Sequence, residues 1–394
     1  MHHRTSALAR SPSVGHPASL GYNALAPGLS KRSFIQLGIA LALLPSAHAL
    51  PARTLAFPRD HGAHPDLRTE WWYITGYAKD PTGREFGFQV TFFRSRVEAT
   101  QNMQSKFAAK QLIFAHCAVT DVQGKKLMHD QRIAREGFGI AQASEQDTDI
   151  KLRDWTLKRA IPAAKSNPAT AQAQATYQAR IATKDFAMDL RFTETQALLL
   201  QGDQGLSRKG PEEQQASYYY SKPQLAAAGR ITVQGKNFDI QGTAWLDHEW
   251  SQELLHPQAV GWDWIGMNLF DGSALTAFQL RRKDGTALWT GGSYRAAPSA
   301  GLPAFVAKPN EVKFQALKGW TSPLTGAKYP TEWLVRTPAD YYTVKAVIAN
   351  QELDSRSSTG VVYWEGLSDL FDSNDKHVGR GYLEMTGYAG ALRM

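Results

Sequence analysis

Residues 243–251 read Thr243-Ala244-Trp245-Leu246-Asp247-His248-Glu249-Trp250-Ser251, with three ionisable side chains between two tryptophans. The alternation of a β-strand sends successive side chains to opposite faces. One face then carries Leu246, His248 and Trp250, and the other carries Trp245, Asp247 and Glu249. An apolar core excludes most ionisable groups, and a solvated edge rarely exposes tryptophan. We therefore expect this strand to form the wall of an apolar cavity that keeps a few polar groups for binding or proton transfer.

Two further clusters combine tryptophan with polar side chains. Residues 60–73 read DHGAHPDLRTEWWY, and residues 261–268 read GWDWIGMN. Tryptophan offers one N–H donor on a large apolar body, so a site for a bulky apolar ligand would use such residues well.

The chain as a whole favours an all-β fold. Aromatic residues make up 11% of its 394 residues, 32 are Gly, and no long segment shows helical periodicity. Short strands separated by turn residues are expected from residue 71 onward. The hairpins that we predict pair residues 71–79 with 84–94, 111–120 with 125–130, 230–233 with 238–242, and 262–270 with 274–282. Two polar stretches, 160–175 and 202–215, are predicted to be loops.

This pattern predicts two barrel-like halves, because many short strands at regular spacing are typical of barrels and sandwiches. We place the boundary between the two halves at residues 243 and 244, at the start of the strand quoted above. The expected domains are residues 50–243 and 244–394, preceded by an export signal in residues 1–49.

The N-terminus has the parts of an export signal. Basic residues at Lys31 and Arg32 precede an apolar run at 37–44, and Ala47-His48-Ala49 supplies a small-residue cleavage site. The run is too short for a permanent membrane helix, so no integral membrane segment is expected after cleavage near Ala49. The motif resembles a twin-arginine signal with Lys31 in place of the first arginine, which leaves twin-arginine export and general secretion both open. The predicted location is the periplasm or the exterior.

Charge and cysteine content exclude other classes. Residues 1–49 hold four basic and no acidic side chains, so the formal charge of +8 falls to +4 in the remaining chain. That mild, scattered charge gives no nucleic-acid footprint. The single cysteine, Cys117, excludes an internal disulfide, and its apolar neighbours at 112–119 favour a buried structural role.

Several motifs in order resemble a known family. They are DHGxHP at 60–65, TEWWY at 69–73, FAH at 114–116, SYYYS at 217–221, WxDHEW at 245–250, GWDW at 261–264, YWEG at 363–366 and GRGYLEMTGY at 379–388. The chain resembles the AttH-type, carotenoid 1,2-hydratase-like group of secreted lipocalin-like proteins, whose members are often labelled predicted secreted hydrolases. The resemblance implies two lipocalin-like antiparallel β-barrels in tandem.

The resemblance also implies a chemistry. The carotenoid hydratases add water to an isoprenoid C=C bond without metal or organic cofactor, and fungal relatives guide cycloadditions. His248 and Trp250 match the His-x-Trp pair expected in the hydratases. The downstream Tyr-x-Asp, with its acid, has no counterpart at residues 275–280, which read LTAFQL. Asp247, Glu249, Asp263 or Asp271 would have to supply the proton instead.

We therefore expect His248 to act as general acid or base, with Asp247 or Glu249 orienting it or supplying a proton. The predicted substrate-binding residues are Trp250, Trp262, Trp264, Asn268, Trp72, Glu70, His64 and His116. The alternative for Asp247, His248 and Glu249 is a polar network that closes one barrel end. Glu70 pairs with Arg68 or Arg94 if it is structural, and His116 is a core histidine if it is not a ligand contact. No metal and no cofactor are expected.

Three functions stay open. The first is an enzyme, of the hydratase, lyase or isomerase type, that acts on a bulky lipid-like or isoprenoid-like molecule without a cofactor. The second is a periplasmic carrier that binds such a molecule without chemistry. The third is an accessory protein of an ABC transporter.

Overall fold

The structure is a computed structural model that describes residues 49–161, 174–253 and 255–392. Within these ranges the regular structure is β-strand apart from 3-10 turns at Arg59–His61, Glu98–Thr100 and Pro298–Ala300. The predicted all-β class is confirmed. The predicted signal segment, except Ala49, and most of the predicted loop at 160–175 lie outside the described residues. No helix among the described residues is long and apolar enough to span a membrane.

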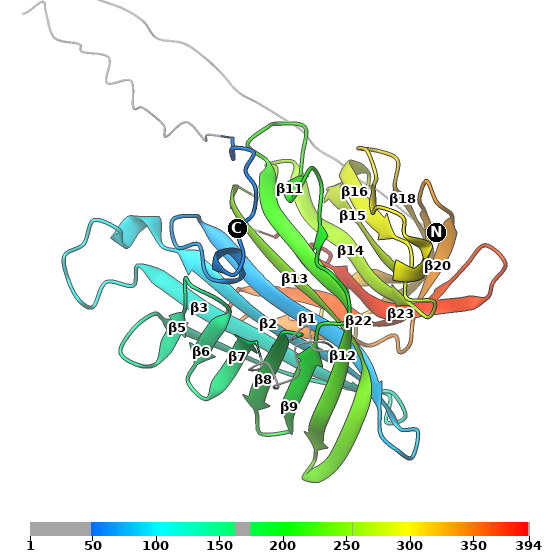
Figure 1. The fold of residues 1–394 in the computed structure, drawn as a ribbon, viewed down its shortest axis with the longest axis horizontal. Helices are drawn as coiled ribbons and strands as arrows, with labels where there is room; N and C mark the ends of the chain where they lie inside the picture. Colours follow the sequence, from blue (N-terminus) through cyan, green and yellow to red (C-terminus); the bar gives the residue numbers. More distant parts are fainter. Residues whose placement is uncertain (1–48, 162–173, 254, 393–394) are drawn as a thin grey trace, which may run out of the picture. The chain divides into compact units, whose positions relative to one another are not determined.

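The first sheet contains 13 strands of the described chain in the order β4-β3-β2-β1-β13-β12-β9-β8-β7-β6-β5, with β10 and β11 also paired to β12 (Figure 1). Their bounds are β1 Thr69–Lys79, β2 Glu85–Arg96, β3 Gln111–Asp121, β4 Lys126–Arg135, β5 Ala141–Ala143, β6 Asp149–Leu152, β7 Trp155–Ala160, β8 Thr176–Ala182, β9 Phe186–Thr193, β10 Leu199–Leu200, β11 Leu206–Arg208, β12 Ala216–Val233 and β13 Lys236–Glu253. The sheet curves until its two ends approach each other. Arg132 of β4 lies 4.2 Å from the ring centroid of Trp155 in β7 and donates a hydrogen bond to the carbonyl of Ala182 in β8.

The second sheet contains 10 strands of the described chain in the order β17-β16-β15-β14-β23-β22-β20-β19-β18, with β21 paired to β22. Their bounds are β14 Ala259–Leu269, β15 Ala274–Arg282, β16 Ala287–Arg295, β17 Phe305–Val306, β18 Lys313–Thr321, β19 Lys328–Arg336, β20 Tyr341–Ala346, β21 Glu352–Ser355, β22 Val361–Phe371 and β23 His377–Met385. Every strand pairing in both sheets is antiparallel, as expected. The four predicted hairpins are confirmed.

The long hairpin of β12 and β13 connects the two sheets. Its two-residue turn, Gln234-Gly235, has positive φ at both positions, which matches the right-handed twist of the flanking strands. Strand β13 runs through the expected boundary at 243/244 and ends at Glu253, and the second sheet begins at Ala259. The division into two domains stays a prediction.

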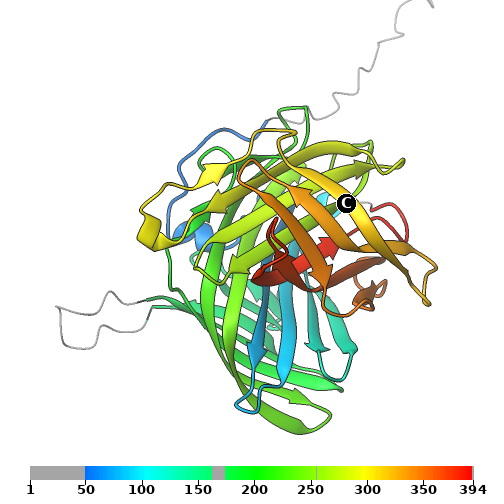
Figure 2. The ribbon, with the colours of Figure 1, turned by 90° about the vertical axis from the view of Figure 1, so that its right-hand side faces the viewer.

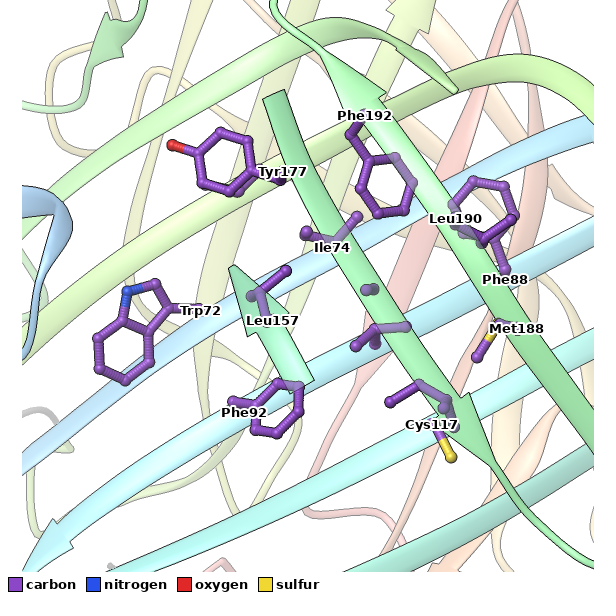
Figure 3. Packing of buried hydrophobic residues seen from close by; sticks show 14 of the residues in the cluster. Trp72, Ile74, Phe88, Phe92, Cys117, Leu157, Tyr177, Met188, Leu190 and Phe192 are labelled. Atoms are coloured by element: carbon purple, nitrogen blue, oxygen red, sulfur yellow. The ribbon is translucent and has the colours of Figure 1, made fainter. Parts of the chain in front are cut away.

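The inward face of the first sheet is filled with apolar side chains. Figure 3 shows Trp72, Ile74, Phe88, Phe92, Cys117, Leu157, Tyr177, Met188, Leu190 and Phe192 packed together. Each of these side chains is at most 2% exposed, and Cys117 is fully buried, as predicted. The second sheet has its own interior cluster, which includes Ile265, Met267, Trp364 and Leu383.

A third layer lies between the sheets, where β14, β22 and β23 pack against β1, β2 and β13 (Figure 2). Hydrogen bonds cross this layer from His116 to Tyr363 (2.9 Å) and from Thr120 to Gln351 (3.0 Å). Its side chains alternate along each strand with those of the two interiors. The layer is aromatic and polar rather than aliphatic.

Candidate functional site

Strand β13 separates the predicted site residues into two groups. Leu246 and Trp250 belong to the interior cluster of the first sheet, whereas Trp245 belongs to the layer between the sheets. The predicted alternation along 245–250 is therefore confirmed. Because of this alternation, His248 faces away from Asp247 and Glu249, the two carboxylates that we expected to act together with it.

The group inside the first sheet is centred on Glu70, which is fully buried at the start of β1. Its Oε1 accepts hydrogen bonds from His64 Nδ1 (2.7 Å) and His248 Nε2 (2.9 Å). Its Oε2 accepts from Arg94 Nε and from the backbone N–H of His64, both at 2.8 Å. The predicted Glu70–Arg94 pair is thus present. His248 is oriented by Glu70 and not, as we expected, by Asp247 or Glu249.

This group continues as a connected network. His64 also contacts Asp60 (3.0 Å), while the Tyr220 hydroxyl contacts both His248 Nδ1 (3.1 Å) and His61 Nδ1 (2.7 Å). Tryptophan rings stack on two of the histidines. The His64 ring stacks on Trp250 with centroids 4.0 Å apart, and the His248 ring stacks on Trp72 at 4.7 Å. The network links the segment before β1 to strands β1, β12 and β13. It includes His248 but not Asp247 or Glu249, so the structural alternative for these three residues as one network stays a prediction.

The electrostatics of the network favour fixed protonation states near neutral pH. Burial lowers the pKa of His248 to about 4, although the neighbouring Glu70 carboxylate opposes this shift. Burial alone would raise the pKa of Glu70, but hydrogen bonds from His248 and His64 bring it well below its ordinary value. Both nitrogens of His248 are engaged and its side chain is fully buried. A role for His248 as general acid or base gains no support from this geometry.

Among the described residues, His64, Glu70 and His248 form a group whose ligand atoms lie close enough together to hold a cation. Two histidines and a carboxylate suit zinc in principle. Each of these atoms already has a hydrogen-bond partner, and Arg94 neutralises Glu70. The network is therefore complete without an ion, and the expected absence of a metal stays a prediction.

The second group lies between the sheets and contains four carboxyl groups. Asp247 and Glu249 come from β13, Glu365 from β22 and Glu384 from β23, where Glu365 and Glu384 are directly paired across the two strands. Asp247, Glu249 and Glu365 are buried, and Glu384 is partly buried. Lys209 is a cation at this site, with its Nζ 3.0 Å from Glu249.

Asp247 and Glu384 have strongly altered acidities. Burial raises the pKa of Asp247 to about 7, against hydrogen bonds from Ser221, Tyr219 and Trp245 at 2.5–2.7 Å. Burial also raises the pKa of Glu384 to about 7, against a hydrogen bond from Trp262. Both groups can hold a proton near neutral pH and release it there, which general acid catalysis requires.

Glu365 is the least satisfied member of the four. Burial, together with the charge of Glu384, raises its pKa well above the ordinary value. Within the described residues, neither Glu365 Oε1 nor the hydroxyl of the facing Tyr73 has a hydrogen-bond partner of normal geometry. Buried polar atoms without partners are rare in folded proteins, and each calls for an explanation. Here the two groups face each other, and the contacts of Glu365 with Tyr73 and Tyr363 lower its pKa against the larger effect of burial.

Aromatic rings surround these acids. Trp264 and Tyr73 meet edge to face at 5.3 Å, and Trp264 meets Trp245 at 6.4 Å. Trp71 and Trp262 pack on the same cluster but are partly exposed. Within the layer, Trp71, Trp262 and Glu384 are partly exposed to solvent.

The remaining predicted contacts have structural partners. His116 lies in the layer, where its two ring nitrogens contact Tyr363 and Ser358, both at 2.9 Å. The Asn268 side chain accepts from Gln224 N (2.9 Å) and donates to Ala244 O (3.0 Å), and so it joins β14 to the central hairpin. Asp263 is paired with Arg281 (2.8 Å). Neither Asn268 nor Asp263 is free to contact a ligand.

Two hollows of the structure are lined by residues other than the predicted ones. A hollow of about 810 Å³ lies near the tip of the β12–β13 hairpin, lined by residues such as Lys79, Asp189, Arg230 and Asp239. A second hollow, of about 340 Å³, is lined by residues of the loop before β3. The predicted site residues line neither hollow.

Sequence reasoning missed Glu365 and Glu384, although both lie within the quoted motifs YWEG and GRGYLEMTGY. The signal that could have found them is a carboxylate next to a large apolar residue within a strand, as in Trp364-Glu365 and Leu383-Glu384-Met385. Their proximity to Asp247 depends on the packing of two sheets, which no local pattern reveals.

The acidity of Asp247 predicts a pH-dependent stability. Between its ordinary pKa of 3.8 and its folded value of about 7, the folded protein retains a proton that the unfolded chain has released. The contribution of Asp247 to stability is therefore full below about pH 4 and is lost as the pH rises through about 7. Asp247→Asn is neutral throughout, so this variant should gain stability relative to the parent between about pH 5 and about pH 8. Urea unfolding at both pH values measures the difference.

The control for this comparison is Asp239→Asn on the same strand, whose carboxylate is 72% exposed. It should give the same difference from the parent at both pH values. A constant difference for Asp247→Asn as well would show that Asp247 ionises normally.

These features define a class of protein: two lipocalin-like antiparallel sheets with a layer of buried acids and aromatic rings between them. The AttH-like family model matches residues 48–388, and the chain belongs to this family. A search of curated proteins gives no match.

Solved structures agree with the family assignment. A crystal structure assigned as an AttH protein from Nitrosomonas europaea is 44% identical, with a TM-score of 0.76 over 86% of this chain and 99% of that one. Kievitone hydratase from Nectria haematococca is 12% identical, with a TM-score of 0.63 over 86% of this chain and 94% of that one. CghA with Sch210972 is 11% identical, with a TM-score of 0.50 over 82% and 89%. The last two likenesses concern the fold alone.

Proposed function

We propose that this protein is an acid–base enzyme of the hydratase type, which acts on a neutral, apolar molecule bound between the two sheets. The observation that carries the proposal is the layer of carboxyl groups with raised pKa values among tryptophan and tyrosine rings. An acid that stays protonated near neutral pH is what addition of water to an unactivated alkene needs first. Four carboxyl groups at one site also disfavour an anionic substrate.

Carboxyl groups of this chain can both supply the proton for the hydration and take it back. The protonated carboxyl of Glu384 gives its proton to one alkene carbon, and the neighbouring carbon becomes a cation. Water adds its oxygen to the cation, and the proton that it loses returns a carboxylate to the acid form. The faces of Trp262 and Trp264 can stabilise the cation by about 1–2 kcal/mol when water is excluded. The reverse sequence is a dehydration.

Relatives of similar architecture support the reaction class by analogy only. One of the proteins that share the fold is named a hydratase, at 12% identity. Residues 275–280 lack the aspartate that is expected to be the proton donor in the carotenoid hydratases. In this chain Glu384 or Asp247 supplies the proton instead. The residues that would bind the substrate are the partly exposed Trp71 and Trp262.

The carrier alternative needs a cavity for its ligand. The inward face of the first sheet is lined by closely packed apolar side chains (Figure 3). We prefer an enzyme because the raised pKa values of Asp247, Glu365 and Glu384 serve proton transfer and are not needed by a carrier. The ABC-transporter alternative stays a prediction. Export through the segment before Leu50 is part of the proposal, and sequencing the N-terminus of the native protein tests it.

A turnover experiment tests the proposal. The full chain is incubated with neutral isoprenoid alkenes in heavy-oxygen water, and products are analysed by mass spectrometry. We expect a product heavier by one molecule of water that carries the heavy oxygen, and we expect Glu384→Gln to lower its formation by about 10²- to 10⁴-fold. His248→Gln, on the other face of β13, should keep turnover as long as it folds.

Two outcomes would contradict the proposal. Loss of turnover in a folded His248→Gln variant, with normal turnover in Glu384→Gln, would place the chemistry inside the first sheet. An apolar molecule that co-purifies in stoichiometric amount and is never converted would favour the carrier.

A further inference from the structure

Apolar side chains protrude from two loops at one end of the first sheet. Phe107 and Met103, in the loop between β2 and β3, are 74% and 50% exposed, and Phe138 and Ile140, in the turn between β4 and β5, are 58% and 40% exposed. The rings of Phe107 and Phe138 stack on each other with centroids 5.7 Å apart. These four residues, here called the aromatic tip, form one patch outside all the packed cores.

The backbone at Phe138 is unusual for an aromatic residue. Its φ is 55°, in the left-handed region, between Gly137 and Gly139 with φ of 102° and 70°. A bulky residue in this region is strained relative to glycine. Because the ring is mostly exposed, packing does not compensate for this strain. Phe138 is therefore a strained position whose ring is presented to the outside of the protein.

Basic groups accompany the aromatic tip. The guanidinium of Arg135 lies 4.1 Å from the Phe138 ring centroid and 5.6 Å from that of Phe107. Lys106 and Lys110 are exposed and line the hollow of about 340 Å³ next to the tip. Glu136 also lines this hollow, so the local balance is three cations to one carboxyl.

We propose that the aromatic tip docks on a membrane surface that contains anionic phospholipids. Phenylalanine rings on short loops reach the boundary between headgroups and acyl chains, and adjacent Lys and Arg contact lipid phosphates. Each basic side chain near such a surface strengthens the attraction to anionic lipids. A stable protein partner would need about 800 Å² of complementary surface, which four side chains on two turns do not offer. A bilayer therefore fits this patch better than a folded partner.

The test uses the full chain and a label at the tip. Phe107→Cys accepts a polarity-sensitive fluorophore, because the native Cys117 is buried and protected. We expect a blue shift of the label with vesicles of phosphatidylcholine and phosphatidylglycerol, a smaller shift with phosphatidylcholine alone, and none with inorganic phosphate. The same label at Leu324→Cys, which is 57% exposed on the second sheet, is the control and should stay in water.

A second variant makes the result independent of the label. Phe107→Ser with Phe138→Ser should weaken vesicle binding by about tenfold or more, since two rings no longer enter the interface. Leu324→Ser should bind like the parent. A label at residue 107 that remains in water on anionic vesicles, or a double variant that binds them like the parent, overturns the proposal. Dimerisation of the parent that the double variant abolishes, with no vesicle binding, would assign the tip to a second copy of the chain instead.

Discussion

Replacing Glu384 by Gln is expected to lower turnover by about 10²- to 10⁴-fold, which is the usual contribution of a positioned general acid. The amide of Gln keeps the size and most hydrogen bonds of the Glu side chain, but it has no acidic proton to transfer to the alkene. The fold should persist, because Glu384 is partly buried and Trp262 can still donate to the amide oxygen. The measurement is the rate of product formation at saturating alkene, beside a near-ultraviolet circular dichroism spectrum.

The control for this prediction is a buried acid outside the layer. Glu352 accepts hydrogen bonds from Thr325 (2.7 Å) and Tyr329 (2.9 Å) within the second sheet. Glu352→Gln should leave turnover per folded molecule close to that of the parent. Equal turnover in Glu384→Gln and the parent would remove Glu384 from the chemistry.

Replacing Glu70 by Ala is expected to lower the free energy of unfolding by about 3–5 kcal/mol, the usual cost of removing one partner of a buried ion pair. The change leaves Arg94, which is 1% exposed, without its carboxylate, and it removes the acceptor of both His64 and His248. Urea unfolding at neutral pH measures the loss.

The matched control is Glu98→Ala, since Glu98 is an exposed carboxylate paired with Arg96 at 2.8 Å. Surface pairs of this kind contribute about 0–1 kcal/mol. If Glu70→Ala costs no more than Glu98→Ala, the network around Glu70 does not hold the segment before β1 in place.

Local pattern predicted much of the fold. The alternation at residues 245–250 assigned each side chain to its correct face, and turn residues located the hairpins, for example Asp80 to Gly83 between β1 and β2. These features depend on neighbours in sequence, and so they can be read from it. The length of the β12–β13 hairpin was not predicted, because each strand faces different surroundings along its 18 residues.

The candidate site was predicted only in part. Asp247, Trp262 and Trp264 were identified, but Glu365 and Glu384 were not, since more than a hundred residues separate them from Asp247. Glu70 was expected to pair with an arginine, which is confirmed, yet its contact with His248 arises from the pairing of β1 with β13. The packing partner of each strand face decides which face carries the candidate catalytic side chains. That partner is known only from the tertiary structure.

Infrared titration of the full chain shows whether the acids between the sheets stay protonated near neutral pH. Protonated and ionised carboxyl groups absorb in separate regions, so their ratio can be followed as the pH is raised. The account predicts protonated carboxyl groups that persist to about pH 7, with smaller amplitude in Asp247→Asn and in Glu384→Gln. Complete ionisation below about pH 5, as expected for exposed Asp and Glu, would contradict the account.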